Sequence, residues 1–126
     1  MTCIVTLHKD IEHKDVAEVF RQALEDWLNS GVLPEIFGNY GAWESNAALC
    51  LSFVYKMHIK MPPEKPWKKS TPQMDRKSNS YLVFSRHWTD FNNIQIISIM
   101  SPDAHEKART TFLTELERRA EEFQNS

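Results

Sequence analysis

Cysteine and glycine are scarce in this chain, whose 126 residues include two cysteines and three glycines. Cys3 and Cys50 lie in apolar runs with no CxxC pattern and no histidine at metal-ligand spacing, which argues against a zinc site and a secreted disulfide scaffold. No Gly-rich phosphate loop, GxSxG elbow or HExxH motif occurs, so nucleotide-dependent, serine-hydrolase and zinc-protease chemistry have no support. No DxD-type carboxylate pair lies in the basic region described below. We therefore expect neither a metal nor a small-molecule cofactor.

Long hydrophobic runs are also missing. None approaches the roughly 18 apolar residues of a membrane span. The N-terminus lacks the basic stretch and apolar run of a signal peptide. We therefore expect a cytoplasmic protein that does not associate with membranes. The length suits a single domain over residues 1–126, and such a chain buries roughly two-thirds of its unfolded surface without help from disulfides or metals.

The net charge of −2 conceals a strong asymmetry along the chain. Residues 1–55 carry a net charge of −5, residues 56–87 of +6 and residues 88–126 of −3. A local positive field attracts polyanions whatever the overall charge. Aromatic residues are interleaved with the basic ones, the combination that binds single-stranded nucleic acid; they are Tyr55, Trp67, Tyr81, Phe84 and Trp88. Composition alone leaves open a solvated loop flanked by strands whose aromatics belong to the core.

The hydrophobic pattern predicts an α+β domain. Apolar residues at helical spacing predict a helix from Ile11 to Asn29, begun by Asp10 or Asp15 and ended by Gly31. A closing helix is expected to start at Ser101-Pro102. The expected strands are Cys3–Leu7, Leu49–Met61, Tyr81–Ser85 and Ile94–Met100. The remaining segments read as connections: a turn or short helical piece over Leu33–Gly38, a loop over Asn39–Asn46, and a long Pro- and Lys-rich connection over Pro62–Asn79. This order predicts a three- to four-stranded, mainly antiparallel sheet with the C-terminal helix packed on it.

Four stretches, spread over roughly residues 20–125, carry a family resemblance. The most specific is GVLPEIFG, residues 31–38. The others are Met57-His58-Ile59, Gln73 and Arg76 ahead of Leu82-Val83-Phe84, and the run from Ser101 to Arg109. Together they resemble the YafO family of toxins from bacterial type II toxin–antitoxin systems. The resemblance implies a RelE/ParE-like fold and a ribosome-dependent mRNA interferase, an endoribonuclease that cleaves mRNA during translation. It also implies a cognate antitoxin as protein partner.

Metal-independent RNA cleavage needs a base for the 2′-OH, cations for the phosphate and an acid for the leaving oxygen. His105 is a catalytic candidate for one of the proton transfers; it falls in the first turn of the expected closing helix, where backbone N–H groups could bind a phosphate. His58 and Lys60 are two residues apart on a strand and so share a face; His58 is expected to help or orient the catalytic group, and Lys60 to contact the phosphate. Lys60 stands where family members carry a second histidine, which puts a two-histidine mechanism on this strand in doubt.

The resemblance makes Arg76 a candidate for bidentate binding of the scissile phosphate. Arg109 could contact the phosphate, or it could form an ion pair with Glu106 or Asp103 in its own helix. General contact with the RNA backbone is assigned to Lys56, Lys65, Lys68, Lys69, Lys77 and Arg86. The remaining histidines, His8, His13 and His87, read as surface residues.

Two other functions remain open for such a chain. One is a RelE/ParE-like toxin that acts by binding a different target, such as a DNA topoisomerase. The other is an RNA-binding module without catalysis.

Overall fold

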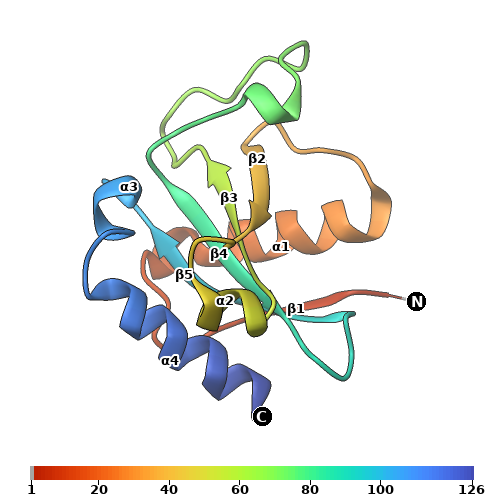
Figure 1. Cartoon of the computed structure of the whole chain (residues 1–126). Coiled ribbons are helices and arrows are strands. Elements are labelled where there is room, and N and C mark those ends of the chain that lie inside the picture. Colours follow the sequence, from red (N-terminus) through yellow and green to blue (C-terminus); the bar gives the residue numbers. More distant parts are fainter. Residues whose placement is uncertain (1) are drawn as a thin grey trace.

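The structure, a computed structural model, describes residues 2–126 and has a mixed five-stranded sheet between two layers of helices (Figure 1). The strands are β1 (Ile4–Leu7), β2 (Phe37–Ala42), β3 (Val54–Ile59), β4 (Tyr81–Arg86) and β5 (Asn93–Met100). The helices are α1 (Lys14–Ser30), α2 (Ala47–Leu51), α3 (Ala104–Lys107), α4 (Phe112–Gln124) and the 3-10 turn η1 (Gln73–Asp75). The strand order is β1-β5-β4-β3-β2, with β1 parallel to β5 and the other pairs antiparallel. This confirms the α+β class, but the sheet has five strands where three or four were expected.

Alternating side chains of the central strands build one apolar core on each face of the sheet. Phe20 and Leu24 of α1 pack with Met57 and Phe84 on one face. On the opposite face, α2 and α4 pack against the other side of the same strands, with Trp43, Leu49, Val54, Val83, Ile97 and Leu116 among the buried residues. Figure 1 shows α1 on one side of the sheet and α2 with α4 on the other. Within the described residues, no helix is long and apolar enough to cross a membrane.

The C-terminal end of helix α1 agrees with the prediction, and its N-terminal end does not. Gly31, at φ 78°, ends the helix by donating its N–H to the Trp27 carbonyl, as predicted. At the other end the prediction of an aspartate cap was wrong: His13 precedes the first turn in a left-handed conformation and its side chain makes no capping bond.

The predicted loop over Asn39–Asn46 was wrong in its first half, because residues 39–42 belong to strand β2. Two glycines and an asparagine hid this strand, since both residue types are depleted in strands. Gly38 is required by packing: a Cβ there would lie 2.5 Å from the carbonyl oxygen of Arg76. The predicted strand Leu49–Met61 was also too long, because its first residues form α2 and only Val54–Ile59 is strand.

The predicted continuous closing helix was wrong as well, since it is broken into α3 and α4. The hydroxyl of Thr110 donates to the Lys107 carbonyl and accepts the N–H of Phe112. A threonine side chain that bonds the backbone in this way offers it an alternative to the helical ladder. Only one turn of helix therefore surrounds His105.

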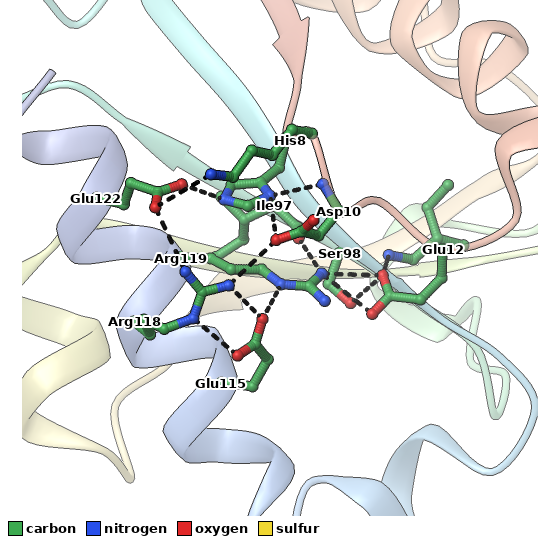
Figure 2. A network of polar contacts seen from close by, with 11 residues as sticks. His8, Asp10, Glu12, Ile97, Ser98, Glu115, Arg118, Arg119 and Glu122 are labelled. Atoms are coloured by element: carbon green, nitrogen blue, oxygen red, sulfur yellow. Dashed lines mark hydrogen bonds and ion pairs between the residues drawn. The ribbon is translucent and has the colours of Figure 1, made fainter.

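A polar network holds α4 against the segment between β1 and α1 (Figure 2). The Arg119 guanidinium, almost fully buried, donates to the carbonyl of Ile97 at 2.8 Å and pairs with Glu12 and Glu115. Glu12 also accepts the hydroxyl of Ser98. His8 lies 2.8 Å from Glu122 at the far end of the network. This network fixes where the last helix lies, and so how the α3 segment before it reaches the sheet.

Candidate active site

Two imidazoles and a phenol come together where β3, β4 and α3 meet. The antiparallel register places His58 of β3 opposite Tyr81 of β4, with ring centroids 5.0 Å apart. His105 of α3 lies 5.2 Å from the Tyr81 ring and 6.0 Å from the His58 ring. The Tyr81 hydroxyl is 2.7 Å from Nδ1 of His105. We call these three residues the His58–Tyr81–His105 cluster.

Asn79 holds α3, and with it His105, beside the start of β4. Its side-chain oxygen accepts the backbone N–H of His105 at 3.0 Å, and its carbonyl accepts the N–H of Ala104 at 3.1 Å. Its amide group also donates to Glu106 at 3.3 Å. The predicted phosphate site at a helix N-terminus was therefore wrong, because the His105 N–H is already bonded and α3 has a single turn.

His58 is half-buried and its environment favours the neutral imidazole. Its Nδ1 lies 2.8 Å from both the carbonyl oxygen and the amide nitrogen of Ser78. Burial lowers the pKa of His58, a bond to the Ser78 carbonyl opposes this, and the charges of His105, Lys56 and Lys77 lower it further. Within residues 2–126, Nε2 of His58 has no hydrogen-bond partner. This nitrogen is thus available to a ligand.

The Tyr81 phenol is held in its protonated form. Burial raises the pKa of Tyr81, and the negative charge of Glu106 raises it further. A protonated phenol can donate its hydrogen to His105. The hydroxyl therefore remains a hydrogen-bond donor at neutral pH.

Lys56 lies on the same face of the sheet as this cluster. Its ammonium is 5.6 Å from the centre of the Tyr81 ring and 4.8 Å from that of Trp43. A shallow hollow of about 240 Å³ adjoins it, lined by Asn39, Tyr40, Gly41, Ala42, Glu44, Lys56 and His58. A cation, a free imidazole nitrogen and an open hollow therefore adjoin one another.

Arg76 lies elsewhere, and the expectation that it reaches a phosphate does not fit its surroundings. Arg76 is only 3% exposed, and its guanidinium donates to the backbone carbonyls of residues 34, 37, 68 and 71. Gln73 adds a bond to the Gly38 carbonyl, and Asn39 donates to the Arg76 carbonyl. The GVLPEIFG stretch and the Gln73–Arg76 stretch therefore form one structural unit, which we call the Arg76 clamp. It ties the long basic connection to β2.

The other predicted residues are dispersed. Lys60 packs over the ring of Trp67, with its ammonium 4.9 Å from the centroid. Lys65, Lys68, Lys69 and Lys77 are exposed on the long connection, and Lys69 pairs with Glu35. Arg109 is exposed just after α3. Arg86 is at the end of β4 opposite to Tyr81, so the structure does not bring it to the cluster.

Sequence reasoning missed Tyr81 as a site residue. It was noted only as an aromatic in the basic region, and its pairing with His58 depends on a strand register that the sequence does not reveal. The interpretation of His8 and His87 as surface residues was wrong, since they are 3% and 9% exposed. Within residues 2–126, no three His, Cys, Asp or Glu side chains lie close enough together to hold a metal ion.

Comparison with known proteins adds one finding. Residues 25–125 match the model of a protein family described as "Toxin YafO, type II toxin-antitoxin system". The match covers both strands of the cluster, α3 and the whole of the Arg76 clamp. Comparison with curated proteins and with solved structures gave no match.

Proposed function

Because the chain belongs to the YafO family of type II toxin–antitoxin toxins, we propose that it is a ribosome-dependent endoribonuclease that cleaves mRNA during translation. Its target would place it in the cytoplasm, and the RelE-like fold that its resemblance implied remains part of the proposal. The observation that carries the chemistry is the His58–Tyr81–His105 cluster, in which two imidazoles with different environments lie 6.0 Å apart.

The His58 imidazole is suited to the role of base. Its lowered pKa keeps it neutral at neutral pH, and Nε2 is free to accept a proton. The 2′-hydroxyl of the nucleotide before the scissile bond gives its proton to Nε2. The resulting 2′-oxygen attacks the adjacent phosphorus and displaces the 5′-oxygen of the next nucleotide. The products are a 2′,3′-cyclic phosphate and a free 5′-hydroxyl, and no other reactant is consumed.

The His105 imidazole is suited to the role of acid. In this role the imidazole is protonated on both nitrogens: Nδ1–H donates to the hydroxyl oxygen of Tyr81, and the departing 5′-oxygen takes the proton on Nε2, which leaves a neutral imidazole. Lys56 lies close enough to the cluster to balance the charge that develops on the phosphate. Lys60 and Arg109 are proposed as further phosphate contacts.

Contact with the rest of the mRNA is proposed for the long connection. Lys65, Lys68, Lys69 and Lys77 are exposed there, and the Arg76 clamp holds their segment in place. Such contacts neutralise phosphates irrespective of base sequence, so they contribute a salt-dependent affinity.

The test is to incubate purified protein with ribosomes and a translated mRNA and to map the 5′ ends of the fragments. We expect cleavage within the translated region and a 5′-hydroxyl on each downstream fragment. His105→Ala, at an exposed position, should abolish cleavage without changing the melting temperature, whereas Lys14→Ala, at an exposed position on α1, should cleave normally.

Intact message in the presence of folded protein would contradict the proposal. DNA damage on expression would then indicate a different target, such as a topoisomerase. Salt-sensitive RNA binding without cleavage would indicate a binding module.

A further inference from the structure

The two edges of the sheet differ in whether their outward backbone groups have hydrogen-bond partners. At the β1 edge they do. The N–H and carbonyl of Cys3 are both bonded by the Asn29 side chain, at 2.7 and 3.0 Å. The N–H of Val5 donates to Glu25 at 2.9 Å, and its carbonyl accepts from Arg21 at 3.2 Å. Side chains of α1 thus occupy the outward backbone groups of Cys3 and Val5, and covering an edge in this way is how proteins prevent strand pairing there.

The other edge, β2, is open over its second half. The N–H of Trp43 donates to the carbonyl of Val54, which fixes the hydrogen-bonded pairs of the β2–β3 ladder. Because such pairs alternate, the backbone groups of Tyr40 and Ala42 point away from β3. Within residues 2–126, the backbone N–H and carbonyl groups of Tyr40 and Ala42 that point away from β3 have no hydrogen-bond partner. The first half of β2 is closed by the Arg76 clamp, so the open edge is short.

An apolar groove lies beside this open edge, on the face that α1 covers. It measures about 270 Å³ and is lined by Leu28, Tyr40, Tyr55, Phe84, Arg86 and Phe91. Tyr40 and Phe91 are each nearly half exposed. Arg86 donates to the Phe91 carbonyl at 3.2 Å and, within the described residues, has no carboxylate partner. The groove therefore favours an apolar side chain accompanied by a carboxylate.

The opposite face of the same edge holds the hollow next to Lys56 and His58. A strand paired with β2 would send alternate side chains to the two faces. One set would fill the apolar groove and reach Arg86. The other set would cover the hollow, where Lys56 favours a second carboxylate.

We infer that the open edge of β2 binds an extended, acidic and alternately apolar segment of the cognate antitoxin, which adds a sixth strand to the sheet. Type II toxins have such a protein partner, and strand addition gains affinity from backbone bonds and specificity from side-chain pockets. Covering the hollow would also keep RNA from His58. Only this inhibitory consequence depends on the proposed cleavage; the docking does not.

Hydrogen–deuterium exchange tests the docking directly. The probe is the cognate antitoxin, purified as a complex with the toxin after co-expression. We expect the amides of Tyr40 and Ala42 to exchange at least roughly tenfold more slowly in the complex than in the free toxin. The exposed amide of Lys65 should not change. Unchanged exchange at Tyr40 and Ala42 in a stable complex would overturn the inference.

Two variants test the same surface by affinity. Arg86→Glu should weaken antitoxin binding by roughly tenfold or more through charge reversal. Ala42→Pro removes an N–H that the free toxin does not use, so it should fold and yet bind more weakly. Val19→Asp, on the exposed surface of α1, is the matched control and should bind normally.

Normal binding by both edge variants would contradict the inference. Protection of the two amides that grows with the concentration of toxin alone would assign the edge to a second copy of the chain instead, and would also overturn it. A failure of mRNA cleavage would leave these binding results unaffected, so the two proposals can fail separately.

Discussion

The Tyr81 hydroxyl lies 2.7 Å from Nδ1 of His105 and 3.3 Å from its Nε2. The raised pKa of Tyr81 keeps the phenol protonated, and its hydroxyl can donate to Nδ1 of a neutral His105 or accept Nδ1–H of a protonated one; in both forms the hydrogen on Nε2 is left free. His58 is held at its own Nδ1 by Ser78. Each imidazole is therefore oriented through one nitrogen, and the other nitrogen is left for the substrate. This is the arrangement that the proposed base and acid roles of the two histidines require.

Removing the Tyr81 hydroxyl should impair catalysis without impairing binding. Tyr81→Phe keeps the ring contacts but leaves Nδ1 of His105 without its hydrogen-bond partner, so we expect the single-turnover cleavage rate to fall roughly tenfold. The affinity for ribosomes should not change. Tyr55→Phe is the matched control, because that ring stacks on Phe84 in the opposite core. Equal rates for the two variants would remove Tyr81 from the mechanism.

The cleavage rate should fall with acid in a way that Lys56 controls. His58 must be neutral to act as base, and its pKa lies below the ordinary value of 6.5, so the rate should stay high at neutral pH and drop only below that value. Lys56→Met removes a charge that lowers the pKa, so the drop should move to higher pH. Pre-steady-state cleavage across pH 5 to 8 measures this, with Lys65→Met as control. A shift to lower pH would contradict the assignment of His58 as base.

The elements best predicted from the sequence are those whose local pattern agrees with their place in the fold. Strands β1, β4 and β5 are rich in β-branched and aromatic residues, and the stripe of α1 ends at a glycine in the left-handed conformation that ends helices. Strand β2 was missed because Gly38 serves a tertiary contact with Arg76, which no local pattern reports. The break before α4 depends on the Thr110 hydroxyl, a small effect beside a continuous apolar stripe.

The site was predictable by residue type and less so by arrangement. His58 and His105 were both identified in the sequence, and the structure places them side by side. Tyr81 needed the strand register. Arg76 shows the opposite failure: an arginine in a basic loop suggests a phosphate contact, but only burial and backbone partners reveal that its charge is used within the fold.

Arg119 should stabilise the fold far more than its neighbour Arg118. Arg119→Ala removes a nearly buried guanidinium that joins the carbonyl of Ile97 to Glu12 and Glu115. We therefore expect the free energy of unfolding to fall by about 2–4 kcal/mol. Arg118→Ala breaks only exposed ion pairs on the same helix and should change stability little. Urea denaturation of both variants measures the difference. A similar loss of stability in the two variants would show that burial does not determine how much these ion pairs stabilise the fold.

The Arg76 clamp gives a prediction with a matched pair of glycines on one strand. At Gly38 an added Cβ would meet backbone and side chain of Arg76 at 2.5 and 2.9 Å, whereas at Gly41 it would meet nothing within 4 Å. Gly38→Ala should therefore loosen the long connection and lower the melting temperature, and Gly41→Ala should not. If Arg76 acts through the clamp, Arg76→Met should resemble Gly38→Ala in both stability and faster amide exchange over residues 62–79. If Arg76 instead bound the scissile phosphate, Arg76→Met would lose cleavage while keeping its melting temperature, and the clamp would be refuted.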